Sequence, residues 1–232
     1  MMFYLRSALL APVLFAQGKR TRRTVPVLPE PPGEREGRAG SGQPVSVLIA
    51  GDSGAAGVGA ETQDEALLGR LVADLAADFS VTWNLQATSG HTTARTLDRL
   101  ERLPQQHFDV AVTSLGVNDA ISMVSLGNWR RRQARLRELL REKFSVDTLI
   151  VSGLPPMHGF PALPQPLRWH IGARATQFDR ALARDVGAEN DTQFIDLRFT
   201  EDMDLMASDG FHPGPGIYAE WARLVAAAIR AR

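Results

Sequence analysis

Short apolar runs of strand length alternate with longer stretches of helical spacing along most of this 232-residue chain. Five runs predict strands, at residues 45–50, 81–86, 108–116, 146–154 and 192–197. Stretches with apolar residues at helical spacing predict helices at 65–79, 93–103, 128–144, 168–187 and 216–232. Strands that alternate with helices form a parallel sheet with helices on both faces. The pattern therefore predicts a three-layer α/β/α sandwich around a mostly parallel, five-stranded sheet.

The first 44 residues differ from this pattern. Residues 7–16 form an apolar run too short to span a bilayer, which needs about 20 residues. Most of the positive charge follows this run, whereas a secretory signal carries it in front. Residues 26–44 are rich in proline, glycine and charge, which predicts an irregular linker. We therefore divide the chain into an N-terminal segment, 1–44, and a domain, 45–232. The apolar run is either a helix docked on the protein or a membrane surface, or a signal or anchor segment.

Charge and cysteine content exclude several classes of protein. The formal net charge is zero, which gives no electrostatic basis for nucleic-acid binding. The absence of cysteine excludes disulfides, thiolate nucleophiles and cysteine metal sites, and it fits a reducing compartment. Residues 1–44 carry a net charge of +4 and the remainder −4, so peripheral contact of residues 1–23 with anionic lipid is a further expectation. We expect a cytoplasmic protein, membrane-associated through that segment, with export as the alternative.

A run of small residues follows the first predicted strand. The stretch "LIAGDSGAAGVGA" (residues 48–60) has glycine spacings like those of nucleotide-binding loops. However, Thr62 stands where a dinucleotide fingerprint needs its third glycine, and Ala60 where a phosphate loop needs its lysine. Ser53 lies where a strand turns towards a helix, as in a nucleophile elbow, although Ala55 replaces the last glycine of that motif. Alone, Ser53 is interpreted more simply as a helix cap, so its function depends on partners elsewhere.

Three further segments offer such partners. A serine nucleophile needs a base, a carboxylate that orients the base, and donors for the developing oxyanion. In "SDGFHPG", Asp209 precedes His212 by three residues in a turn-forming loop; an Asx turn with an incidental histidine is the alternative. In "SLGVNDA", Asn118 follows a strand and presents either a side-chain amide donor or a helix cap. Gly90 follows the second strand and offers a backbone N–H.

These four segments, in this order, resemble the conserved blocks of the SGNH, or GDSL-type, hydrolase superfamily over about residues 45–232. The matching blocks are residues 51–53, Gly90, residues 116–119 and residues 209–213. Gly54 departs from the leucine in the family's name. The N-terminal apolar and basic stretch, with the proline-rich loop at 155–169, is similar to a bacterial esterase- and lipase-like branch. The resemblance implies a flavodoxin-like strand order.

The resemblance also implies the residues of the site. Ser53 is the expected nucleophile, His212 the base and then acid, and Asp209 the group that orients His212. The backbone N–H groups of Ser53 and Gly90, with the Asn118 side chain, form the expected oxyanion hole. No metal or cofactor is required. Asp52 and Asp119 are interpreted as structural carboxylates, since they lie beside turns.

The expected substrate is a small-molecule carboxylic ester with a short- to medium-chain acyl or aryl group. The alternatives are acyl transfer or thioester hydrolysis on the same acyl-enzyme, and a non-catalytic binding domain on the same fold. Residues 154–172 form a long loop rich in proline and apolar side chains. We interpret this loop either as the wall of an acyl pocket or as a buried packing loop.

Overall fold

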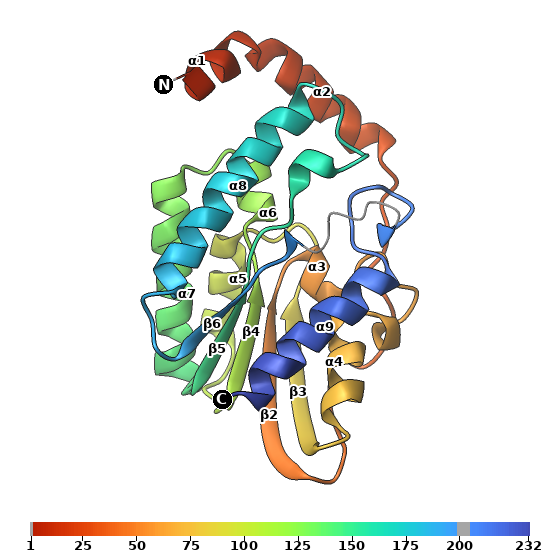
Figure 1. Cartoon of the computed structure of the whole chain (residues 1–232), viewed down its shortest axis with the longest axis vertical. Coiled ribbons are helices and arrows are strands. Elements are labelled where there is room, and N and C mark those ends of the chain that lie inside the picture. Colours follow the sequence, from red (N-terminus) through yellow and green to blue (C-terminus); the bar gives the residue numbers. More distant parts are fainter. Residues whose placement is uncertain (1, 199–204) are drawn as a thin grey trace.

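The computed structural model describes residues 2–198 and 205–232, in which six strands form one sheet in the order β1-β3-β2-β4-β5-β6 (Figure 1). The strands are β1 Glu36–Ala39, β2 Gln43–Gly51, β3 Phe79–Ala87, β4 Val110–Ser114, β5 Thr148–Ser152 and β6 Thr192–Ile195. Every neighbouring pair is parallel except β1 and β3. From β3 to β6 the order is that of flavodoxin-like sheets. The predicted α/β class is confirmed.

The sheet has one more strand than the five predicted. Residues 36–39 were predicted to lie in an irregular linker, but they form β1 and pair antiparallel with β3. The sequence "EGRA" shows no apolar alternation because β1 is an edge strand whose side chains are mostly exposed. β1 is therefore held in the sheet by its backbone pairing with β3 rather than by burial of apolar side chains. Gly37 lies against the Trp83 ring, where an added Cβ would come within 2.5 Å of a ring carbon.

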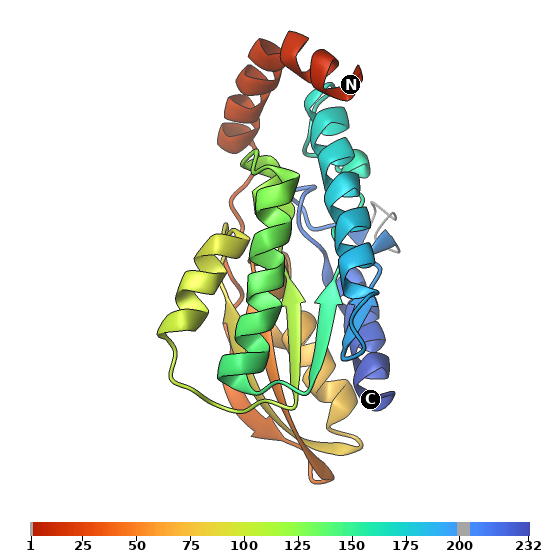
Figure 2. The same cartoon turned by 90° about the vertical axis from the view of Figure 1, so that its left-hand side faces the viewer.

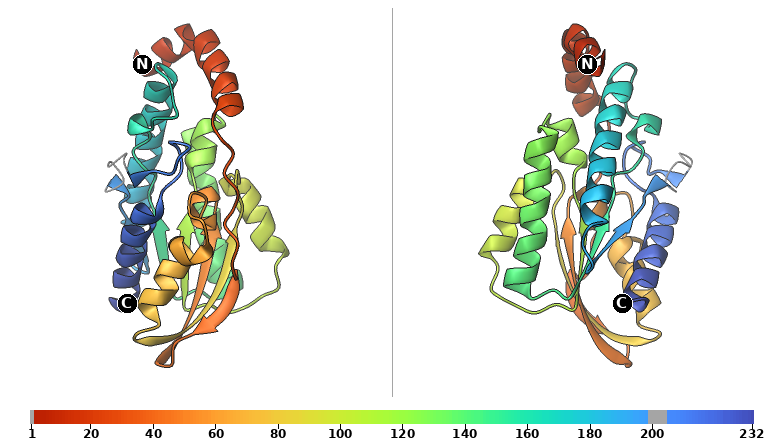
Figure 3. Two further views of the ribbon diagram at one scale, coloured as in Figure 1. Left: turned by 90° about the vertical axis from the view of Figure 1, so that its right-hand side faces the viewer. Right: turned by 60° about the vertical axis from the view of Figure 1, so that its left-hand side comes forward.

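Helices cover both faces of the sheet (Figures 2 and 3). Helices α4 (Leu67–Leu75) and α9 (Pro215–Arg230) pack on one face, and α5 (Thr93–Arg102), α7 (Leu126–Phe144) and α8 (Leu167–Val186) on the other. Alternate residues of β2 face the two layers, since Val47 and Ile49 join the first core and Leu48 and Ala50 the second. Short helices follow three strands, namely α3 (Ser53–Ala56) after β2, α6 (Val117–Ile121) after β4 and the 3-10 turn η2 (Met157–Gly159) after β5, and the 3-10 turn η1 (Gln63–Glu65) precedes α4.

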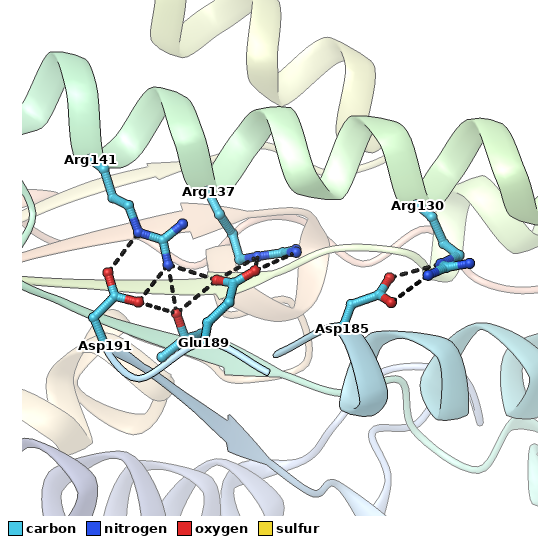
Figure 4. Close-up of polar contacts among 7 residues, drawn as sticks. Arg130, Arg137, Arg141, Asp185, Glu189 and Asp191 are labelled. Atoms are coloured by element: carbon cyan, nitrogen blue, oxygen red, sulfur yellow. Dashed lines mark hydrogen bonds and ion pairs between the residues drawn. The ribbon is translucent and has the colours of Figure 1, made fainter. Parts of the chain in front are cut away.

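A network of ion pairs joins α7 to the end of α8 and to the connection between α8 and β6 (Figure 4). The Arg141 guanidinium contacts both oxygens of Asp191 at 2.6 Å and also Glu189 at 2.6 Å. Arg137 pairs with Glu189, and Arg130 with Asp185 nearer the start of α7. The hydrogen bond from Arg141 holds the pKa of Asp191 below its usual value. Much of the positive charge of the arginines of α7 is thus neutralised within the protein.

The N-terminal segment forms two helices, α1 (Met2–Leu9) and α2 (Ala11–Thr24), that lie across the first turns of α8 (Figure 1). The Ser7 hydroxyl and His170 Nδ1 are 2.9 Å apart, and Gln17 bonds to the backbone of Gln165 and Leu167. This segment therefore docks on the protein itself. Its outer side exposes four large apolar side chains, Leu5, Leu9, Val13 and Phe15. Membrane contact stays a prediction, and no helix among the described residues has the length and apolar character needed to cross a bilayer.

Candidate active site

The candidate site lies at the carboxyl ends of the central strands, where loops after β2, β3 and β4 meet the loop before α9. Ser53 is the first residue of α3, directly after β2 and Asp52. The Asp52 backbone N–H donates to Ser114 O at the end of β4, 3.2 Å away. Parallel strands end at the same edge of a sheet, so residues distant in sequence meet there.

Ser53, His212 and Asp209 form a continuous chain of hydrogen bonds. Ser53 Oγ lies 3.0 Å from His212 Nε2, and His212 Nδ1 lies 2.5 Å from Asp209 Oδ2. The other Asp209 oxygen accepts the backbone N–H groups of Phe211 and His212. Although burial raises the pKa of Asp209, the hydrogen bonds from the His212 ring and backbone outweigh that effect and hold the pKa below its usual value. Asp209 is therefore an ionised, buried acceptor for the imidazole.

A second buried carboxyl, that of Asp52, lies between the Ser53 turn and Asn118. Asp52 is only 4% exposed, accepts the Gly54 N–H at 3.2 Å and accepts Asn118 Nδ2 at 3.3 Å. Burial raises the pKa of Asp52 to about 7. Asn118 Nδ2 also donates to the His91 carbonyl at 3.1 Å. Both hydrogens of this amide are thus directed at protein acceptors.

Near the site, the backbone N–H groups of Ser53 and Gly90 make no hydrogen bond to any acceptor within residues 2–198 and 205–232. Gly90 has a φ of +76°, a left-handed conformation that favours glycine. An added Cβ there would meet no atom within 4 Å, so the backbone angle, not crowding, explains this glycine. The unpartnered N–H groups are available to a negatively charged oxygen.

The model of the GDSL-like lipase/acylhydrolase family matches residues 49–220. The chain belongs to this family. It is a carboxylic ester hydrolase, as the sequence predicted, and no curated protein sequence matches it significantly.

Solved structures of esterases share the hydrolase's fold. A carbohydrate esterase family 2 enzyme with a carbohydrate-binding domain, from Corynascus thermopiles (Myceliophthora fergusii), is 17% identical, covers 89% of this chain and 68% of its own, and has a TM-score of 0.66. A carbohydrate acetylesterase family member from Sinorhizobium meliloti is 21% identical; the match covers 81% of this chain and 98% of that one, with a TM-score of 0.56. A psychrotrophic esterase from Pseudoalteromonas sp. is 20% identical; the match covers 80% of this chain and 97% of that one, with a TM-score of 0.55.

The hydrolase uses its glycine-rich stretch for close packing. Gly59 has a φ of +105°, and a Cβ there would lie 2.2 Å from the Pro213 carbonyl oxygen. The turn after α3 therefore lies directly against the loop that carries His212. The Tyr218 hydroxyl of α9 donates to Val58 O at 2.7 Å and joins the same two segments. Both contacts fix His212 relative to Ser53.

Asp119 lies beside the site but points away from it. Its Oδ2 accepts the backbone N–H and the hydroxyl of Thr93, at 2.8 and 2.9 Å, at the start of α5. Asp119 is fully buried, and burial raises its pKa. As predicted, Asp119 and Asp52 hold the ends of neighbouring elements. His107 and Asp147, which with Asp109 form an exposed group of potential metal ligands, lie at the opposite edge of the sheet.

A small apolar pocket opens beside Ser53 and His212 in the hydrolase, with a volume of about 60 Å³. Its apolar walls are Val117, Pro155, Phe160, Leu197, Met206, Phe211, Pro213, Ile217 and Trp221. The rings of Phe160 and Phe211 meet edge to face at 5.3 Å. In the loop at 154–172, Pro155 and Phe160 line this pocket, while Met157 and Leu163 are buried in the core as a packing loop would be; that the pocket takes an acyl group stays a prediction.

Two residues of the predicted linker reach the site. Glu30 accepts the Ser89 N–H at 2.6 Å and pairs with Arg35, which also donates to the Ala87 carbonyl. Burial raises the pKa of Glu30, but the Ser89 and Arg35 contacts outweigh it and lower the pKa overall. These bonds hold the loop that carries Gly90. Sequence analysis missed them because the partners are backbone atoms, which leave no pattern in the sequence.

We predict that Glu30→Ala lowers kcat for ester hydrolysis about tenfold with a smaller change in KM, because the Gly90 loop loses its anchor and a donor is displaced. Glu30→Gln keeps a carbonyl acceptor for Ser89 and should recover most of the activity. Glu34→Ala, an exposed neighbour in the same segment, is the matched control. Equal kcat values for Glu30→Ala and Glu34→Ala would show that the anchor has no effect on catalysis.

Proposed function

We propose that the protein hydrolyses carboxylic esters with short- to medium-chain acyl or aryl groups through an acyl-enzyme on Ser53. The observation that carries the proposal is the hydrogen-bonded chain Asp209–His212–Ser53, with separations of 2.5 and 3.0 Å. This arrangement suits transfer of the serine proton to the imidazole. The pocket beside this chain of hydrogen bonds is apolar, which supports an apolar rather than a charged acyl group on the ester carbonyl.

The reaction has two balanced halves. Ser53 Oγ attacks the ester carbonyl carbon while His212 Nε2 takes the hydroxyl proton, and His212 then gives that proton to the departing alkoxide. The alcohol leaves and the acyl group stays on Ser53. A water molecule next attacks the acyl-enzyme, with His212 as base, and the carboxylic acid is released as Ser53 recovers its proton. The Asp209 carboxylate stabilises the imidazolium in both halves.

The developing oxyanion is bound by the backbone N–H groups of Ser53 and Gly90 and by the Asn118 amide. The two backbone donors face no acceptor of the described chain, which supports this role. Asn118 donates to Asp52 and His91 O in the free enzyme, so one of these bonds gives way when the oxyanion forms. The exchange is favourable because a charged acceptor forms the stronger hydrogen bond.

We predict that Ser53→Ala abolishes ester hydrolysis and labelling by a fluorophosphonate probe, since both need the serine oxygen. The melting temperature should change little, because a small and partly exposed side chain is removed. Ser122→Ala, at an exposed serine in the same sheet-edge region, is the control. A folded Ser53→Ala protein with full activity would contradict the proposed nucleophile.

Asn118→Ala should lower kcat by about 10² to 10³ with less effect on KM, the cost of removing one oxyanion donor. Steady-state kinetics on a 4-nitrophenyl ester measures this split, and circular dichroism checks folding. Asn190→Ala, at an exposed asparagine remote from the site, should match the wild type. An unchanged kcat in Asn118→Ala would remove this residue from the oxyanion hole.

The size of the apolar pocket predicts where activity peaks in a chain-length series. A cavity of about 60 Å³ has room for only a few water molecules, so short acyl chains fit best. We expect kcat/KM for 4-nitrophenyl esters to be highest for short chains and to fall as the chain lengthens. Phe160→Leu, which widens the pocket, should extend the range, whereas Phe15→Leu on the exposed side of α2 should not. A maximum at long chains in the wild type would contradict the pocket as the acyl site.

A further inference from the structure

A second and larger hollow lies along the exposed side of α5, with a volume of about 400 Å³. Its lining residues are His91, Arg95, Asp98, Arg99, Arg102 and Leu103. We call this feature the arginine hollow. The small apolar pocket beside Ser53 is lined by residues of α9 and of the segment after β5. The arginine hollow lies on the α5 side of the sheet, beyond the end of β3.

The three arginines form one face of α5, because they are spaced four and three residues apart. At 1.5 Å per residue the helix separates Arg95 from Arg102 by about 10 Å along its axis. Arg99 is held in place by neutral acceptors, Gln86 Oε1 at 2.8 Å and Thr88 Oγ1 at 3.3 Å. Within residues 2–198 and 205–232 none of the three makes an ion pair with a carboxylate, although Asp98 also lines the hollow. The positive charge of the hollow is therefore largely uncompensated.

His91 connects this hollow to the catalytic groups. Its side chain lines the hollow, while its carbonyl accepts Asn118 Nδ2 at 3.1 Å and it directly follows Gly90. The ring atom Nδ1 is buried and has no hydrogen-bond partner in the described chain. Burial, and then the charges of Arg99 and Arg95, lower the pKa of His91. The field of the arginines thus extends to the loop that carries Gly90.

We propose that the arginine hollow binds an anionic phosphate or carboxylate group on the alcohol side of the ester substrate. The inference rests on the proposed function, because it takes the acyl group to fill the small apolar pocket. With that pocket occupied, we take the alcohol portion to extend past Asn118 to His91, whose carbonyl accepts Asn118 Nδ2 and which lines the hollow. Guanidinium groups bind both anions through paired, charge-assisted hydrogen bonds.

The size and charge of the hollow favour a small group over a large acidic partner. The chain has no net charge, and the three arginines that line the hollow lie on one face of one helix, so the hollow itself holds a compact positive charge. The arginines of α7, by contrast, are largely paired with carboxylates. A compact anion at the end of a flexible alcohol fits this arrangement.

The test compares acetate esters of hydroxyalkyl phosphates, with spacers of increasing length, against the same esters ending in a neutral hydroxyl. We expect wild-type kcat/KM to favour the phosphate ester at one spacer length by about tenfold or more, with inorganic phosphate as a competitive inhibitor. The double variant Arg95→Gln/Arg102→Gln should bring that ratio close to one. Arg70→Gln, at an exposed arginine of α4 on the other face of the sheet, should leave the ratio unchanged. A carboxylate-terminated series shows which anion fits better.

A binding measurement separates this inference from the proposed function. Ser53→Ala should bind inorganic phosphate by calorimetry, and the added Arg95→Gln/Arg102→Gln pair should abolish that binding. If Ser53 is not the nucleophile, the phosphate result still tests the hollow. Equal phosphate affinity with and without the two arginines would overturn the inference. So would an equal preference for the phosphate ester over the neutral ester in the wild type, the Arg95→Gln/Arg102→Gln variant and the Arg70→Gln variant. Raising the salt concentration should weaken the preference, as screening of exposed charges requires.

Discussion

The candidate site depends on the buried carboxyl of Asp52, which joins the ends of two strands. It caps the turn that carries Ser53 and accepts a hydrogen bond from the amide of Asn118 in α6, the short helix after β4. Burying this carboxyl raises its pKa to about 7, so its ionisation is disfavoured. The hydrogen bonds that it accepts offset part of that cost. In return, the proposed nucleophile and the proposed oxyanion donor keep a fixed separation.

The groups that follow strands directly could be predicted from the sequence. Ser53, Gly90 and Asn118 each come within a few residues of a strand end, and the strands themselves have a clear apolar pattern. A parallel sheet then brings them to one edge. The distance between Ser53 and His212 needed the structure, because it depends on how Gly59 packs against Pro213 and on the Tyr218 hydrogen bond. The strand β1 escaped prediction since its order comes from backbone pairing alone.

Arginine-rich helices look alike in the sequence and differ in the folded protein. Residues 128–144 and 93–103 both have several basic residues at helical spacing. In α7, the arginines at 137 and 141 meet Glu189 and Asp191, about 50 positions further along the chain. Among the residues that the structure describes, no carboxylate pairs with Arg95, Arg99 or Arg102 of α5, and these arginines line an open hollow. The charge composition of a helix therefore does not predict which of its arginines lack carboxylate partners, because those partners are distant in sequence.

Because of the contacts of Glu30 and Arg35, the structural unit that supports the candidate site begins before residue 45. The hydrophobic pattern starts at residue 45, and a boundary drawn there retains β2 to β6, the sheet order and the Asp209–His212–Ser53 chain. It also removes β1 and both side chains that hold the β3–α5 loop. A segment without helices or an apolar core of its own thus supplies part of the framework of the site. Insertions or deletions between residues 25 and 44 would therefore alter the β3–α5 loop from outside the residues that match the family, 49–220.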